Sequence, residues 1–147
     1  GLRVARELLA GLALPQPTEV TVPFDATQAE IHAASQQLRA ATQGRVAVLV
    51  LGDGSARRGQ KAPGHFDERA SAVDDTIAAA LAAGDPQPLT DLEPILADEL
   101  LIAGRAAWQV LAGAVPGPPV EATATMSDPF GVAYHVALWQ WGRGSDE

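Results

Sequence analysis

The sequence predicts an α/β domain with three layers, α/β/α, a mixed sheet and a C-terminal β-hairpin. An almost unbroken apolar run at residues 45–51 is typical of a strand that is buried on both faces. Several segments around it carry apolar side chains at helical spacing. Near the end of the chain, residues 120–126 and 132–139 alternate polar and apolar side chains around turn-forming residues, which favours a hairpin.

The N-terminal part of the chain is expected to contain a helix, a strand and a second helix. Residues 2–12 have an apolar stripe, and the prolines that follow should end this helix. Residues 18–24 alternate as a strand does. Asp25 or Thr27 can cap the next helix, and Glu30 completes a capping-box pattern with Thr27. The buried stripe of that helix is predicted to consist of Ile31, Ala34 and Leu38.

This second helix should end near Gly44, directly before the strand at 45–51. Residues 59–66 are rich in turn formers and are expected to be irregular. A helix of small residues should run from Asp67 to Ala83. Three shorter helices are predicted at residues 89–92, 94–103 and 105–114, and a flexible tail at 142–147.

Composition limits the kinds of partner. The net charge is −8 and no stripe of Lys and Arg is present, which argues against nucleic acid and against an anionic membrane. The apolar runs are much shorter than the roughly 20 residues that a membrane span requires, so a cytoplasmic protein is expected. Cysteine is absent, which excludes disulfides and thiolate ligands. A metal site would have few nitrogen ligands to use, namely His32, His65 and His135.

Residues 52–58 form the first candidate for a site. This Gly-Asp-Gly-Ser-Ala-Arg-Arg stretch directly follows the apolar run, and open α/β sheets bind ligands at such strand ends. A Gly-rich turn can also point several amides at an anion. A tight connection in which Asp53 caps the turn and the arginines are solvated is an equal alternative. The expected contacts to a small-molecule ligand are Gly52, Gly54, Ser55 and Arg57.

These motifs resemble a known family. The stretch 52–58, followed by Ala-Pro-Gly at 62–64, Ala-Leu-Ala-Ala-Gly-Asp at 80–85 and Gly-Arg-Ala-Ala-Trp-Gln at 104–109, is similar to the LigB-like class III extradiol ring-cleaving dioxygenases. The phrase from 52 to 85 resembles an actinobacterial branch of that superfamily most specifically. The resemblance covers almost the whole chain and implies a single domain, residues 1–147, that is the C-terminal portion of the family domain.

The resemblance implies non-haem Fe(II), held by two histidines and a glutamate, that binds O₂ and a small catechol-like diol. It also implies an acid/base histidine in a Gly-Asp-Leu-Ser-His-Arg-like phrase. Ala56 occupies the position of that histidine, and a methyl group cannot carry a proton. The glutamate ligand would lie near Gly104, where no carboxylate is present, and the histidine ligands would lie upstream of Gly1. No metal ligand is therefore expected within this chain.

Other side chains could take over these roles. His65 follows Ala56 on a Gly-flanked loop and can replace the missing histidine, or it is a half-exposed loop residue. Glu99 lies one helical turn before Ala103 and can act as a carboxylate ligand, or it is solvated. Asp53 or His65 can also serve as the base of a different reaction in the same pocket.

The remaining polar residues are expected to be structural. A cluster of acidic side chains around the start of a helix is typical of capping, because the helix dipole favours carboxylates there. The cluster consists of Asp67, Glu68, Asp74 and Asp75. His32 and His135 are expected to be structural, and Trp108 to lie in the core.

Two functions follow from these observations. One is Fe(II)- and O₂-dependent ring opening of a small aromatic diol. The other is a catalytically degenerate relative that binds a small ligand or a protein on the same fold. Because missing strands would leave apolar surface uncovered, a homodimer is among the expected assemblies.

Overall fold

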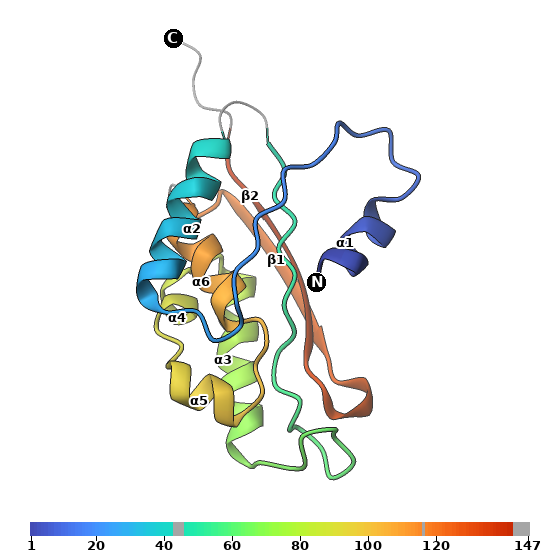
Figure 1. Cartoon of the computed structure of the whole chain (residues 1–147). Helices are drawn as coiled ribbons and strands as arrows, with labels where there is room; N and C mark the ends of the chain where they lie inside the picture. Colours follow the sequence, from blue (N-terminus) through green and yellow to red (C-terminus); the bar gives the residue numbers. More distant parts are fainter. Residues whose placement is uncertain (43–45, 116, 143–147) are drawn as a thin grey trace.

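The computed structural model describes residues 1–42, 46–115 and 117–142 (Figure 1). Within these residues the fold is mixed α/β and ends in an antiparallel hairpin, as predicted. The helices are α1 (Leu2–Leu9), α2 (Gln28–Ala41), α3 (Arg69–Ala83), α4 (Gln87–Thr90), α5 (Pro94–Glu99), α6 (Arg105–Ala114) and the 3-10 helix η1 (Pro129–Gly131). The strands are β1 (Glu121–Ser127) and β2 (Tyr134–Gln140).

The hairpin has one partly covered face and one open face. Its register runs from Glu121 opposite Gln140 to Ser127 opposite Tyr134. Burial alternates along β1, as expected for a strand whose inner face packs against α3. The Trp139 indole N–H donates to the Leu81 carbonyl at 2.7 Å and ties β2 to the end of α3. The helices therefore cover one face of the hairpin.

The main core forms between α3 and the segments that follow it. α3 ends at Ala83, and its C-cap is Gly84, whose φ of 68° glycine adopts most readily. Trp108 from α6 completes this core, as predicted. The buried residues are Ala70, Ile77, Ala80, Leu81, Leu89, Ala97, Leu100, Ile102 and Trp108.

Two buried polar side chains make α6 the centre of the helical layer. The Arg105 guanidinium donates to the carbonyls of Phe24 and Ala26 at 2.9 and 3.0 Å. The Gln109 amide donates to the carbonyls of Thr90 and Leu92 at 2.9 and 3.0 Å and accepts from Arg105. These bonds satisfy backbone carbonyls that would otherwise be buried without partners.

The predicted capping box begins α2. The Glu30 amide donates to the Thr27 hydroxyl at 3.3 Å, and the Thr27 amide donates to the Glu30 carboxylate at 2.8 Å. The hydrogen bonds that the Thr27 amide and the Thr27 hydroxyl donate to the Glu30 carboxylate lower the pKa of Glu30. Ile31 is buried and packs with Ala34 and Leu38, also as predicted. α2 ends at Ala41, and Gly44 lies outside the described residues.

Both N-terminal strand predictions are wrong. Residues 18–23 and 46–51 contain no strand, and Arg45 lies outside the described residues. The side chains of Val46, Val48 and Leu49 are 42–50% exposed, so this run is not buried on both faces. A strand requires a neighbouring backbone to complete its hydrogen bonds, and apolar content cannot supply one.

Helices are found in all the predicted regions, although some of their ends differ. α1 ends at Leu9 rather than at residue 12, because the chain turns at Gly11 with a φ of 84°. α3, α4 and α6 overlap the helices that were predicted there, and residues 59–66 are irregular as expected. α5 ends at Glu99 rather than at residue 103, because the chain turns at Leu101 with a φ of 55°. Residues 143–147 of the predicted flexible tail lie outside the described residues. Among the described helices, none combines the length and apolar character needed to cross a bilayer.

Candidate functional site

The backbone of loop 52–58 pairs with the segment that leads into β2. The Gly54 amide donates to the Ala133 carbonyl, and the Ala133 amide donates to the Ser55 carbonyl, both at 2.9 Å. The Arg58 amide donates to the Gly131 carbonyl at 3.1 Å. Two residues, Gly54 and Ser55, thus face one partner residue, which is the arrangement of a β-bulge. A bulge leaves one amide without a backbone partner, here the amide of Ser55.

Asp74 satisfies this amide from the middle of α3. Its side chain is fully buried, and its Oδ1 accepts the Ser55 amide at 3.0 Å. Arg58 Nη1 lies 3.5 Å from Asp74 Oδ2, and Arg58 Nε donates to Asp128 at 3.1 Å. Partial burial lowers the pKa of Arg58, but the hydrogen bond to Asp128 and the nearby carboxylates outweigh it, so the pKa is raised. Asp74 is therefore a paired internal anion.

The hydroxyl of Ser55 is fully used within the protein. Ser55 is 0% exposed; its Oγ donates to the Leu100 carbonyl at 2.7 Å and accepts the Arg57 amide at 3.1 Å. A side chain with this environment cannot contact a ligand in the described conformation. The predicted ligand contact by Ser55 is thus replaced by a contact that fixes the loop on the end of α5.

The two glycines of the loop are required by close packing. A Cβ on Gly54 would lie 2.7 Å from both Asp74 Oδ1 and the Ala133 methyl. A Cβ on Gly52 would collide with the backbone of Gly104. Neither glycine needs a positive φ. In the described structure, the absence of a side chain lets Gly104 pack against Gly52 and lets Asp74 and Ala133 pack against Gly54.

His135 on β2 completes the buried cluster. Its Nε2 lies 3.8 Å from Asp74 Oδ1, and its side chain is 3% exposed. Neither ring nitrogen has a hydrogen-bond partner among the described residues. The indole of Trp108 packs edge-to-face on the imidazole, with ring centroids 5.8 Å apart. The cluster defined here as the loop cluster consists of Ser55, Arg58, Asp74, Trp108 and His135.

The other predicted site residues lie outside this cluster or face solvent. The Asp53 side chain is exposed, and its carbonyl accepts the Gly104 amide at 2.8 Å. His65 is exposed on a turn with a φ of 62°. The Arg57 side chain is half-buried, and its Nε has no hydrogen-bond partner in the described chain. The structure thus gathers Gly54 and Ser55 but not Asp53 or His65.

The residues of this chain do not by themselves fit an iron site with two histidines and one carboxylate. Within the ranges that the structure describes, no three His, Asp or Glu side chains converge. Glu99, the alternative ligand, is half-exposed and pairs with Arg69 at 2.8 Å. Asp67 also pairs with Arg69 at 2.8 Å, and this hydrogen bond lowers the pKa of Asp67 to about 2.

Sequence reasoning misses the central roles of Asp74 and His135. The acidic pattern favours helix capping by Asp74, but this residue lies in the interior of α3. Its spacing from Ala70, Ile77 and Leu81 places it on the buried stripe of that helix, and this signal could have identified it. His135 alternates with Trp139 on the inner face of β2, which indicates burial but not the partner.

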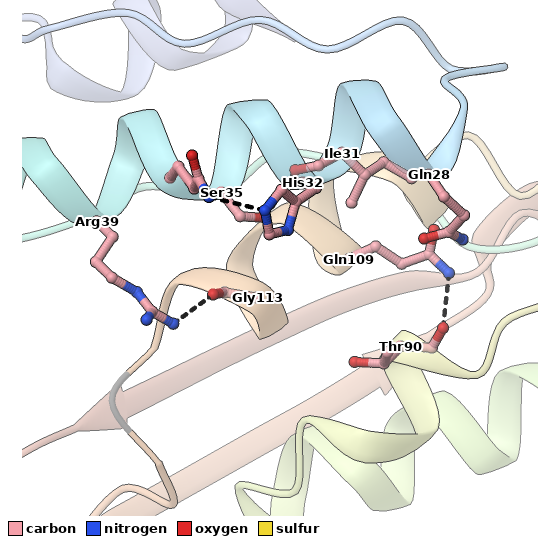
Figure 2. A pocket seen from close by; sticks show the side chains of 9 residues that line it. Gln28, Ile31, His32, Ser35, Arg39, Thr90, Gln109 and Gly113 are labelled. Carbon is pink, nitrogen blue, oxygen red and sulfur yellow. Dashed lines mark hydrogen bonds between the residues drawn. The ribbon is translucent and has the colours of Figure 1, made fainter.

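A separate groove lies between α2 and α6 (Figure 2). Its volume is about 270 Å³, and Ile31 lines it together with polar side chains such as Gln28 and His32. Several of its polar groups are paired within the chain: Arg39 donates to the Gly113 carbonyl at 2.7 Å, and the Gln36 amide lies 2.7 Å from His32 Nε2. The groove contains none of the residues of loop 52–58.

Comparison of the chain with protein-family models, curated proteins and solved structures found no match. The resemblance to the extradiol dioxygenases therefore stays a prediction.

Proposed function

We propose that this chain is a catalytically degenerate member of the LigB-like superfamily that serves as a binding module. The observation that carries this proposal is the environment of Ser55, which is fully buried with its hydroxyl bonded to Leu100 and Arg57. Ala56 stands beside it, where the resemblance implies a proton-carrying histidine. The loop that would orient a substrate instead holds α3, α5 and β2 together.

The three-layer α/β/α arrangement belongs to the same proposal. α3 covers the inner face of the hairpin, whereas Val136 and Leu138 on the other face are 71% and 58% exposed. In a three-layer arrangement, a second helical layer would cover this open face. Apolar side chains exposed in a row favour a protein partner over a small ligand, because small-ligand sites are concave.

One observation favours ring opening as a second candidate function. The imidazole of His135 lies against Gly54, where an added Cβ would come within 2.9 Å of Nε2. A histidine from β2 thus stands close to the position that Ala56 leaves without one. In this second candidate, His135 would take the place of the proton carrier that Ala56 cannot supply.

Anaerobic addition of Fe(II) to the protein, followed by air and a panel of catechols, tests the two candidates. The binding-module proposal predicts no coloured ring-opened product from any catechol. It also predicts that Ser55→Ala lowers the free energy of unfolding by about 1–3 kcal/mol, because the Leu100 carbonyl and the Arg57 amide lose their buried partner.

Ring opening that depends on Fe(II) and is lost in His135→Gln would overturn the proposal. His32→Gln is the matched control, because His32 is exposed on α2 and lies outside the loop cluster. It should leave any turnover unchanged.

A further inference from the structure

Helix α1 exposes an apolar stripe. None of its residues is buried, and Leu2, Val4 and Leu8 are 36%, 54% and 59% exposed. Its side-chain tie to the rest of the chain is an exposed ion pair, Arg6 to Glu19 at 2.9 Å. Isolated helices shorter than about 12 residues are marginal in water, and most helical stability comes from packing an apolar face. α1 therefore has the properties of a helix that docks on another surface.

The outer face of the hairpin is a surface of matching character. Tyr134, Val136 and Leu138 alternate along β2 and are 39%, 71% and 58% exposed. The register places Thr125 opposite Val136 and Thr123 opposite Leu138 on the same face. This face, called here the open face, is a row of large apolar side chains bordered by threonines.

The chain exposes more surface than a compact monomer of its mass. The chain exposes 9575 Å². A compact monomer of 15.2 kDa exposes about 7100 Å², so the excess is roughly 2500 Å². Stable homodimers bury about 1000–2500 Å² on each partner. The excess therefore suffices for a dimer interface.

The chain's own α1 leaves the open face uncovered. Figure 1 shows α1 apart from the helical layer, joined to α2 by a long connection. That connection, residues 10–27, can span up to roughly 60 Å when extended, far enough to reach a neighbouring molecule. α1 carries Arg3 and Arg6 with a single carboxylate, whereas the chain as a whole has a net charge of −8, so long-range charge does not oppose binding of α1 to a second copy.

We infer that the open face binds α1 of a second copy of this chain, in a two-fold symmetric dimer that exchanges its N-terminal helices. Each α1 stripe would pack on Val136 and Leu138 of the other copy, so both apolar surfaces are covered by one symmetric operation. This inference rests on the proposed binding function and names its partner.

Sedimentation velocity over a range of protein concentrations tests the inference. The wild-type chain should dimerise, and Leu8→Asp and Leu138→Asp should each raise the dimer dissociation constant by roughly 30-fold or more. Ile95→Asp is the matched control, because Ile95 is 75% exposed on α5, away from both surfaces. It should leave the dissociation constant unchanged.

Mixing the two variants gives a sharper test. A mixed dimer of Leu8→Asp and Leu138→Asp contains one intact contact, between the unchanged helix of one copy and the unchanged sheet of the other. The mixture should therefore dimerise more tightly than either variant alone. A dimer that ignores Leu8→Asp, or a mixture no tighter than the single variants, would overturn the exchange.

Cross-linking identifies the occupant of the open face independently of affinity. Because the chain has no cysteine, Leu8→Cys combined with Val136→Cys introduces a unique pair. Oxidation should produce a covalent dimer. A disulfide within one monomer would assign the open face to the chain's own α1, and a wild-type monomer at all concentrations would also refute the inference. Neither result changes the ring-opening assay, so failure here is distinct from failure of the proposed function.

Discussion

Asp74 is the charged residue on which the buried part of the candidate site depends. It accepts the spare amide of the bulge at Ser55 and lies within 4 Å of the charged or polar nitrogens of Arg58 and His135. A carboxylate in this position stabilises the fold only while its partners surround it. The carboxylate that makes the cluster resemble a site is therefore also a structural partner of the Ser55 amide and of Arg58.

Replacing Asp74 with Asn should lower the free energy of unfolding by about 1–3 kcal/mol, because Arg58 loses the fully buried member of its three carboxylate partners and the Ser55 amide loses a charged acceptor. Urea denaturation followed by tryptophan fluorescence measures this. Asp75→Asn is the matched control: Asp75 also lies 3.5 Å from Arg58 but its side chain is 66% exposed. Its loss should cost less than about 1 kcal/mol. Equal effects of the two changes would contradict the assigned role of Asp74.

Asp67 provides a pH-dependent prediction. The hydrogen bond from Arg69 lowers its pKa from 3.8 to about 2. Because the pKa is lower in the folded state, the stabilisation is present above pH 3.8 and is lost as the pH falls through about 2. In Arg69→Gln, NMR titration should show the pKa of Asp67 rising toward 3.8. Arg39→Gln should leave it near 2, and an unchanged value in Arg69→Gln would refute the pairing.

At the scale of elements, the contact between loop 52–58 and β2 depends on the absence of a side chain at Gly54. Gly54→Ala should lower the free energy of unfolding by about 1–3 kcal/mol, because the new methyl must displace Asp74 or Ala133. Gly59→Ala is the matched control, since its nearest neighbour would lie 3.5 Å away. Thermal denaturation of both variants checks this, and equal melting temperatures would contradict it.

The elements also show why some predictions succeeded. α2 and α6 could be predicted because their signals are local: a capping box at Thr27 and apolar residues at helical spacing. Residues 46–51 have the composition of a buried strand, but a strand depends on a partner that lies elsewhere in the chain or in another molecule. The loop cluster joins Ser55, Asp74 and His135, which come from three segments far apart in the sequence. No local sequence pattern indicates that these side chains lie together.

At the scale of the whole molecule, stability should be uneven. α6 lies between both core clusters, and its buried Arg105 and Gln109 hold two other segments, residues 24–26 and 90–92, by their carbonyls. By contrast, residues 46–49 are exposed and α1 buries no side chain. Amide exchange reports such differences, because local opening costs little free energy where few buried contacts must break.

In a dilute sample, hydrogen exchange measured by mass spectrometry should therefore show two classes of amide, one strongly protected and one almost unprotected. Amides of α6 should exchange only when the whole chain unfolds, whereas those of α1 and of residues 46–49 should exchange almost freely. Raising the protein concentration should slow exchange in α1 and in β2 together, because the inferred dimer covers both, and should leave residues 87–90 of α4 unchanged. Protection of α1 that is already complete at high dilution would show that the chain covers its own helix, since contacts within one molecule do not depend on concentration.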